Sequence, residues 1–177
     1  QICLAPDYMI VPQELEERAI GAVSNAVSAM YPTLLNNDDY TSVVNARHRD
    51  RIQGLIDDAK AKGAEAIEVN PGDEDFSASN GHKMPLTILR NVDDTMKVMQ
   101  DEIFGPVLSV LTFRTADEAI VKANNTPYGL SAGIWTQNAS RMLRVADSLR
   151  AGVVWANTFN QFDPTSPFGG YKESGYG

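Results

Sequence analysis

The sequence predicts an α/β fold in which a mostly parallel sheet is flanked by helices. Two observations lead to this prediction. Helical and strand-like patterns alternate through the second half of the chain, and the strand-like segments are short apolar runs. Such runs are typical of strands buried on both faces, as in parallel sheets. The 177 residues, 43% of them apolar, provide for a sizeable core, and we expect residues 1–177 to form a single domain.

The first half of the chain predicts one strand, over residues 8–11, and two helices. Pro12 stands near the start of the first helix, where its missing N–H costs nothing. The apolar stripe of that helix falls at four-residue spacing, on Leu15, Ala19, Val23 and Val27. The second helix is expected over about residues 39–62, with an apolar face made of Val44, Ile52, Leu55, Ile56 and Ala59. Gly63 follows it as a stop signal.

Beyond Gly63, strands and helices follow in turn. Thr115 and Glu118 have the spacing of a capping box, which marks a helix start. The loop-like stretch is residues 70–82, and residues 158–177 show no periodicity. Strands are expected at residues 64–69, 84–89, 106–113, 131–136 and 153–157. Helices are expected at residues 93–102, 115–125 and 138–152.

The charge and cysteine content exclude several classes of protein. A net charge of -8 disfavours binding to nucleic acid and to anionic membrane surfaces, so neither is expected as a partner. The single cysteine, Cys3, cannot form an internal disulfide. A reducing compartment and a cytoplasmic location are therefore expected. No apolar run is long enough to span a bilayer.

Three familiar site types are disfavoured by residue order and spacing. The two histidines, His48 and His82, are far apart and polar in context, so no metal site is expected. The glycines between residues 169 and 177 do not have the spacing of a dinucleotide-binding loop. Ser131 lies in a G-x-S-x-G string, but there the expected helix precedes the serine and the strand follows it. That order is the reverse of a nucleophile elbow.

Four stretches in series resemble the aldehyde dehydrogenase family. "QICLAP" resembles the end of its N-x-G-Q-x-C motif, and "DEIFGPV" resembles its E-E/D-I-F-G-P-V motif. "ANNTPYGLSAGIWT" and "GVVWANTFNQFDPTSPFGGYKESGYG" resemble its two later motifs, and all four stand in the family's order. The first twelve residues resemble coniferyl aldehyde dehydrogenases, whereas the ending resembles broad-substrate branches. The resemblance implies a fold of the aldehyde dehydrogenase catalytic-domain type.

The resemblance implies oxidation of an aldehyde to a carboxylic acid with NAD or NADP. Cys3 matches the nucleophile, which as a thiolate forms a thiohemiacetal and, after hydride loss, a thioester. Glu102 matches the residue that binds the nicotinamide ribose, and Phe104 matches the aromatic residue beside that ribose and ring. Ile2, Leu4, Thr158 and Phe162 are expected along the substrate channel, and their character favours an apolar or aromatic aldehyde.

The family's general-base glutamate, oxyanion-hole asparagine and cofactor-binding domain stand before the cysteine in the family's order. Residues 1–177 are therefore expected to be most of a catalytic domain, without the cofactor-binding domain or the C-terminal oligomerisation tail. The cofactor would be bound mainly by the absent domain. The parent enzyme is expected to be a homodimer or homotetramer, and the isolated chain is expected to have little or no activity.

Two other functions stay open at this point. Cys3 could act as a thiol esterase, since a cysteine can be acylated without a cofactor. The chain could instead be a non-enzymatic interaction module that keeps the fold. A readily alkylated Cys3 would count against the second hypothesis.

Overall fold

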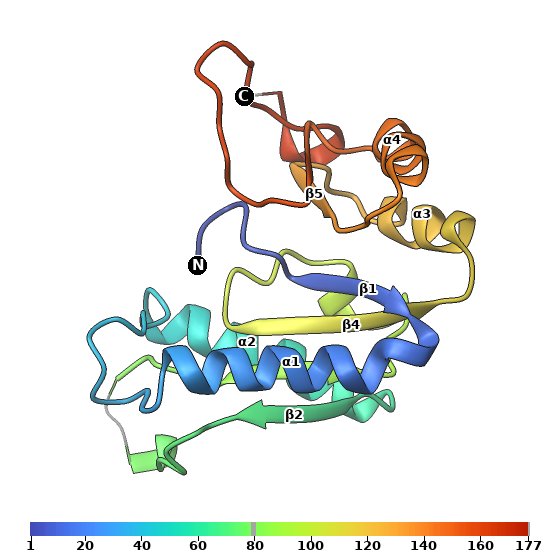
Figure 1. Ribbon diagram of the computed structural model, residues 1–177. Coiled ribbons are helices and arrows are strands. Elements are labelled where there is room, and N and C mark those ends of the chain that lie inside the picture. The colour runs from blue at the N-terminus through green and yellow to red at the C-terminus, as the bar shows by residue number, and fades with distance from the viewer. Residues whose placement is uncertain (79–80, 177) are drawn as a thin grey trace. The chain divides into compact units, whose positions relative to one another are not determined.

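The computed structural model describes residues 1–78 and 81–176, which form two compact units, Gln1–Thr112 and Phe113–Gly177. Each unit has its own sheet and its own helices (Figure 1). The expected loop at residues 70–82 includes two positions, 79 and 80, that lie outside the described residues.

The first unit is built on a four-stranded sheet. Its order is β1 (Tyr8–Pro12), β4 (Val107–Phe113), β3 (Leu86–Arg90) and β2 (Glu65–Val69). β3 and β4 are parallel, with Thr87 opposite Val107, and β2 runs antiparallel to β3, with Glu65 opposite Arg90. All four strands fall where the apolar runs predict them. The two central strands, β3 and β4, are the most buried, as their continuous apolar character requires.

Two helices of the first unit pack on opposite faces of this sheet. α1 (Glu16–Met30) buries Ile20 against Val69, Ile88 and Val110. α2 (Ala46–Ala61) buries Ile52, Leu55, Ile56 and Ala59 against a second cluster that includes Leu89, Val107 and Leu111. Because alternate residues of a strand point to opposite faces, Ile88 and Leu89 serve different clusters. The apolar face predicted for α2 is thus confirmed, apart from Val44.

Two predictions about the second helix are wrong: its start, and the place of Val44 on its apolar face. α2 begins at Ala46, because Asn45 caps it: the Asn45 side chain accepts the backbone N–H of His48 at 3.0 Å. Val44 lies before this cap and is exposed, whereas its neighbour Val43 is buried. The first helix also departs from its predicted apolar stripe. Leu15 belongs to a preceding 3₁₀ turn and is exposed. The buried residue of α1 is Ile20.

The helix expected at residues 93–102 is also wrong. The carboxylate of Asp93 accepts the backbone N–H and the hydroxyl of Thr95, which forms a local turn in place of a first helical turn. The carboxylate of Asp58 accepts the N–H of Lys97. Only a 3₁₀ turn results there. The four 3₁₀ turns of the chain's described residues are Gln13–Leu15, Phe76–Ala78, Lys97–Met99 and Lys172–Ser174.

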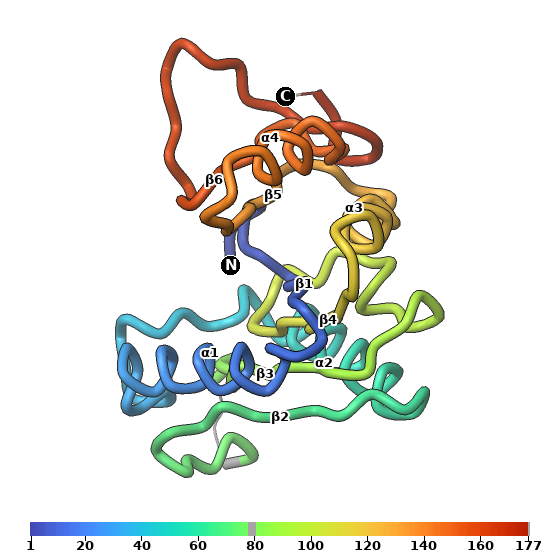
Figure 2. Tube along the Cα trace, turned by 45° about the vertical axis from the view of Figure 1, so that its right-hand side comes forward, coloured from blue at the N-terminus to red at the C-terminus, as the bar shows by residue number. Residues whose placement is uncertain are grey.

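The second unit contains α3 (Ala116–Asn124), β5 (Ser131–Ile134), α4 (Ala139–Ser148) and β6 (Val153–Ala156). β5 and β6 form a parallel pair, and α4 lies beside both strands (Figure 2). Thr115 caps α3 by accepting the N–H of Glu118 at 3.2 Å, so the predicted capping residue is confirmed. With β3–β4 and β5–β6 parallel and β2–β3 antiparallel, the prediction of a mostly parallel sheet flanked by helices is confirmed.

The last stretch of the chain is held by backbone contacts at one glycine. The carbonyl of Gly129 accepts the N–H of both Gly152, at 3.0 Å, and Tyr171, at 2.8 Å. The Gly129 N–H donates to the hydroxyl of Ser174. Lys172 adds a clamp through its Nζ, which donates to the carbonyls of Asn124 and Thr126. These bonds fix a segment that has no periodic structure of its own.

Among residues 1–78 and 81–176, no helix has both the length and the apolar character needed to cross a bilayer.

Gly152→Ala tests the close approach in the second unit. A Cβ atom at position 152 would lie 1.8 Å from the carbonyl oxygen of Gly169 and 2.8 Å from the Cα of Gly170, and neither backbone atom can turn away. We expect the substitution to lower the free energy of unfolding by about 1–3 kcal/mol or more. Urea denaturation followed by tryptophan fluorescence measures it, since Trp135 and Trp155 both lie in this unit.

The control for this prediction is Gly54→Ala. Gly54 lies inside α2, and a Cβ there would meet no atom within 4 Å. Replacing a helical glycine by alanine stabilises by roughly 0.5–1 kcal/mol, so circular dichroism should show equal or greater stability. A Gly152→Ala protein as stable as the wild type would contradict the packing described here.

Candidate functional site

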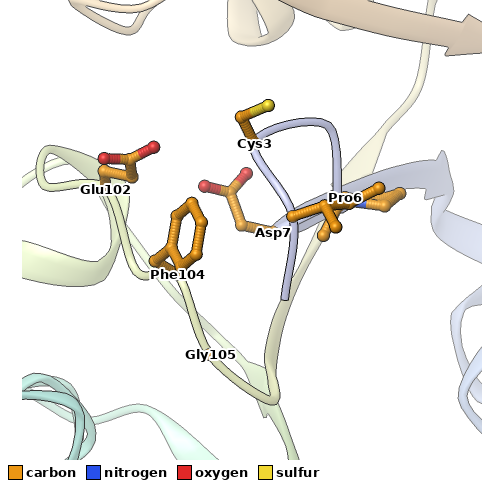
Figure 3. A pocket seen from close by; sticks show the side chains of 8 residues that line it. Cys3, Pro6, Asp7, Glu102, Phe104 and Gly105 are labelled. Carbon is orange, nitrogen blue, oxygen red and sulfur yellow. The ribbon is translucent and has the colours of Figure 1, made fainter. Parts of the chain in front are cut away.

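A small cavity lies in the first unit between two segments that are far apart in the sequence (Figure 3). The first segment, residues 2–7, leads into β1, and the second, residues 102–105, leads into β4, the neighbour of β1. The cavity has a volume of about 40 Å³. That is room for a few water molecules and not for a whole substrate. Its walls are formed by Ile2, Cys3, Ala5, Pro6, Asp7, Glu102, Phe104 and Gly105.

Cys3 is presented by a tight turn. The N–H of Ala5 donates to the carbonyl of Ile2 at 3.0 Å, which closes the turn around Cys3 and Leu4. Leu4 points into the core and is only 7% exposed, whereas the thiol of Cys3 is exposed. The side-chain amide of Gln1 anchors the segment by donating to the carbonyls of Thr41 and Ser42. The turn thus presents the thiol of Cys3 and buries the side chain of the following residue, Leu4.

The second segment is held from behind by Arg51. The guanidinium of this α2 residue donates to the carbonyl of Glu102 at 2.9 Å and also to the carbonyl of Ile103. Ile103 is fully buried in the same cluster as Ile52. Gly105 packs so closely on α2 that a Cβ there would lie 2.3 Å from Cδ1 of Ile52. The backbone of residues 102–105 is therefore fixed by the hydrogen bonds from Arg51, by burial of the Ile103 side chain and by the close contact of Gly105 with Ile52.

Phe104 is turned outward by this arrangement. Its φ of 52° is in the left-handed region, which a bulky residue adopts at a cost of order 1–3 kcal/mol. The side chain is 45% exposed and faces the cavity together with that of Glu102 (Figure 3). Strained residues that surrounding structure holds in place cluster at functional sites. The strain at Phe104 is thus consistent with a binding role for this aromatic ring.

Asp7 is the second carboxyl group of the cavity. Its side chain points into the space shared by Cys3, Glu102 and Phe104 (Figure 3). Its backbone carbonyl accepts the N–H of Ser109 on β4 at 2.9 Å, so its position is fixed to the sheet. Burial raises the pKa of this carboxyl, and the negative charge of Glu102 adds to the effect, while the backbone N–H groups of Asp7 and Tyr8 oppose it.

The ionisable side chains that line the cavity are all acidic. Two carboxyl groups and one thiol line it, and none of the lining residues is basic. Arg51, the α2 residue behind the second segment, donates to the backbone carbonyls of Glu102 and Ile103. The adjacent Tyr8 shows the same environment, since burial, followed by the charge of Asp7, raises the pKa of its phenol to about 12. Such a cavity favours positively charged groups.

The second unit carries the remaining predicted residues, Thr158 and Phe162. Phe162 is half exposed and makes edge-to-face contacts with Trp155, at a centroid distance of 5.5 Å, and with Phe168, at 5.3 Å. The indole N–H of Trp155 donates to the carbonyl of Gln161 at 2.7 Å, which orders the loop. Thr158 is half buried in the same loop. This unit therefore presents an aromatic surface.

The structure brings together four of the seven residues predicted for the site: Ile2, Cys3, Glu102 and Phe104. Leu4 is buried beside them and does not line the cavity, while Thr158 and Phe162 belong to the second unit. Their functional roles stay predictions. In the part of the chain that the structure describes, no three His, Cys, Asp or Glu side chains are grouped as a metal would require.

Sequence reasoning missed Asp7, Arg51 and Gly105. A signal existed for Asp7, because it is an acidic residue on the same short segment as the candidate nucleophile and directly before the first expected strand. Gly105 lies inside the quoted "DEIFGPV" motif without a role assigned to it. Arg51 gave no signal, since it meets its two carbonyl partners only after the chain has folded.

Arg51→Gln tests the two hydrogen bonds by which Arg51 holds the backbone of residues 102–105. The substitution removes two charge-assisted hydrogen bonds, each worth about 1.5–3 kcal/mol at most, so residues 102–105 should open more often. We expect the Val107 amide, which donates to the Gly105 carbonyl at 2.8 Å, to exchange with deuterium roughly tenfold faster or more. Arg47→Gln, an exposed position on the same helix, is the control and should leave that rate unchanged.

Asp7→Asn tests the buried carboxyl through the pH dependence of stability. Because the pKa of Asp7 is raised in the folded state, its contribution to stability is present below the unfolded value of about 4 and is lost as pH rises through the folded value. Asparagine does not ionise. Relative to wild type, the variant should therefore gain stability as pH rises from 3 to 7, roughly the range of this titration.

Urea denaturation at several pH values measures this difference. The exposed Asp38→Asn has the same charge change and should give a difference that is flat with pH. A wild-type advantage over Asp7→Asn that grows toward neutral pH would contradict the expectation.

The comparisons with known proteins identify the family of the chain. The model of the aldehyde dehydrogenase family matches residues 1–177. A probable coniferyl aldehyde dehydrogenase of Caulobacter vibrioides is 45% identical over all of this chain and 37% of its own length. The coniferyl aldehyde dehydrogenase of Pseudomonas sp. strain HR199 is 40% identical, again over all of this chain and 37% of its own length. The chain thus spans little more than a third of the curated relatives it matches.

Solved structures give the same result. A betaine aldehyde dehydrogenase from Staphylococcus aureus superposes with a TM-score of 0.87 at 32% identity, over 100% of this chain and 36% of its own. An indole-3-acetaldehyde dehydrogenase in complex with NAD⁺ superposes with a TM-score of 0.86 at 36% identity, over 99% of this chain and 36% of its own. The fold is therefore that of aldehyde dehydrogenase catalytic domains, and the chain belongs to the aldehyde dehydrogenase family.

Proposed function

We propose that this chain supplies the nucleophile and part of the cofactor site of an NAD(P)-dependent aldehyde dehydrogenase, which oxidises an aldehyde to a carboxylic acid. One observation carries the proposal: Cys3, Glu102 and Phe104 line a single cavity, although they come from distant parts of the sequence. Family membership supports aldehyde oxidation in general. The assignment of the three residues goes beyond it.

Cys3 is the proposed nucleophile. Its thiolate adds to the aldehyde carbon, forms a C–S bond and leaves the oxygen as an alkoxide, to which the backbone N–H of Cys3 can donate. When this alkoxide collapses to a carbonyl, the hydrogen on carbon leaves as hydride. The product is a thioester on Cys3, and attack by water releases the carboxylic acid and restores the thiol. The exposed position of Cys3 leaves the sulfur accessible for these steps.

Glu102 and Phe104 are the proposed cofactor contacts. The exposed carboxylate of Glu102 can accept two hydrogen bonds from a vicinal diol such as a ribose, and the exposed ring of Phe104 offers an apolar face beside it. This pair fits the ribose and ring of a nicotinamide cofactor, which when bound supplies the hydride acceptor. The solved relatives in complex with NAD⁺ support NAD as the cofactor.

The substrate is proposed to be an apolar, aromatic aldehyde. The relatives named coniferyl aldehyde dehydrogenase support this class. The exposed ring of Phe162, ordered by Trp155 and Phe168, is consistent with it, as is the apolar Ile2 beside the thiol. We also propose that both units belong to one catalytic domain, whose cofactor is bound mainly by another part of the intact protein. Homodimer or homotetramer formation and a cytoplasmic location stay predictions.

Cys3→Ser in the intact protein tests the proposal. Serine is a far weaker nucleophile at neutral pH, so the rate of aldehyde oxidation should fall roughly a thousandfold or more. Glu102→Gln should instead raise the KM for the cofactor and lower turnover more modestly. Activity is followed by absorbance of the reduced nicotinamide, and acid quenching with mass spectrometry should locate an acyl group on the Cys3 peptide of the wild type alone. A Cys3→Ser enzyme with wild-type activity would contradict the assignment of Cys3 as the nucleophile.

The isolated 177-residue chain offers a second arm of this test. It should give little or no reduced nicotinamide from an aldehyde, but an activated ester should release one equivalent of alcohol in a burst that Cys3→Ala abolishes. Sustained ester turnover would favour the esterase hypothesis instead. A Cys3 that resists both acylation and alkylation in the folded chain would favour a non-enzymatic role.

A further inference from the structure

Asn157 is the residue at which the chain leaves the sheet of the second unit. β6 ends at Ala156, and residues 158–168 continue as a loop without helix or strand (Figure 2). Thr158 and Phe162, which the sequence predicts for the substrate channel, lie on this loop. The φ of Asn157 is 54°, in the left-handed region that asparagine adopts more readily than most residues. The chain thus turns directly before these two residues.

The side chain of Asn157 takes the place of its own backbone carbonyl. Ile134 of β5 lies opposite Ala156, and the Asn157 N–H continues the ladder by donating to the Ile134 carbonyl at 2.7 Å. In a regular parallel pair, the next bond would run from the Thr136 N–H to the backbone carbonyl of Asn157. Here the Thr136 N–H donates to Oδ1 of Asn157 at 2.9 Å, and Nδ2 donates to the Thr136 carbonyl at 3.0 Å. The backbone can therefore leave the sheet while the last bonds of the ladder are kept.

We propose that Asn157 is a positioning residue that sets the preference for aromatic aldehydes. Its side-chain amide fixes the point from which residues 158–168, the substrate loop, leave the sheet. Asn157 acts through Thr158 and Phe162 and is not itself a contact to the substrate. The inference rests on the proposed function, which takes the substrate to be an aromatic aldehyde that meets Phe162.

A shift at Asn157 would reach Phe162 because the substrate loop packs on one side chain of β6. The indole N–H of Trp155 donates to the carbonyl of Gln161 at 2.7 Å. The rings of Phe159 and Phe162 meet the Trp155 ring edge to face, at centroid distances of 5.2 and 5.5 Å. Trp155 itself is buried in the sheet, with 6% of its surface exposed. The turn at Asn157 therefore sets how the loop lies on a fixed indole.

A second asparagine of the same unit provides a matched control. Asn124, the last residue of α3, accepts the N–H of Arg150 at 2.8 Å and donates to the carbonyl of Ser148 at 2.8 Å. Both partners lie at the end of α4, outside the substrate loop. Because Asn124 is a helical residue, alanine fits its backbone. Asn124→Ala thus removes one accepted and one donated bond, as a change at Asn157 does, but away from the loop.

The test compares two aldehydes in the intact protein. Asn157→Gly keeps the left-handed turn, since glycine adopts positive φ freely, and removes the amide. We expect kcat/KM for cinnamaldehyde to fall about tenfold or more, mainly through KM, because misplaced binding groups cost this much. For acetaldehyde, which has no ring, kcat/KM should stay within about twofold. Asn124→Ala should leave the ratio of the two kcat/KM values unchanged.

A second variant and a second measurement guard against a glycine variant that does not fold. Asn157→Asp keeps the acceptor for the Thr136 N–H, loses the donor and tolerates the left-handed turn. It should shift the ratio in the same direction as Asn157→Gly, by a smaller factor. Deuterium exchange of the Thr136 amide should be roughly tenfold faster or more in Asn157→Gly and unchanged in Asn124→Ala.

The proposal is overturned if Asn157→Gly, or Asn157→Asp in its place, lowers kcat/KM equally for both aldehydes, since the amide would then act only through stability. An equal shift of the ratio in Asn124→Ala overturns it too, as does an unchanged ratio beside faster Thr136 exchange. Failure of the proposed function is recognised separately, by wild-type activity of Cys3→Ser. That result leaves the comparison of the two aldehydes intact.

Discussion

The bond from Arg51 to the backbone carbonyls of Glu102 and Ile103 is the interaction on which the candidate site depends. It joins α2, which packs on one face of the sheet, to the segment that leads into β4. Ile103 can then fill the core, and Gly105 can pass against Ile52. With these residues fixed, the neighbours on either side of Ile103 must face outward. The geometry of the cavity is therefore set by the packing of a helix, not by the cavity residues themselves.

Much of the fold could be predicted from the sequence, because apolar runs report strands directly. The central strands β3 and β4 follow from that signal. The errors have local causes that periodicity does not contain: Asn45 caps α2 later than expected, and the side chains of Asp93 and Asp58 capture backbone N–H groups that a helix would need. In each case a short polar side chain competes with the helix for the backbone.

The site could be predicted only in part. Cys3, Glu102 and Phe104 stand in recognisable motifs, but motifs do not say that the three meet. Their meeting follows from the adjacency of β1 and β4, which pairs strands from opposite ends of the first unit. The sequence also could not reveal that the cavity contains a buried carboxyl group. Asp7 lies in the wall of this cavity, where burial raises the pKa of its carboxyl group.

The hydrogen bond between the Ser109 N–H and the Asp7 carbonyl fixes the point at which the segment that carries Cys3, the proposed nucleophile, joins the sheet. Cys3 stands a few residues before the first residue of β1, with a closed turn and Pro6 between them. An extended residue spans about 3.3 Å, and a shift by one residue turns a strand's side chains to the opposite face. One residue inserted or deleted between Cys3 and Tyr8 would thus move the sulfur by about the length of a hydrogen bond or turn it out of the cavity.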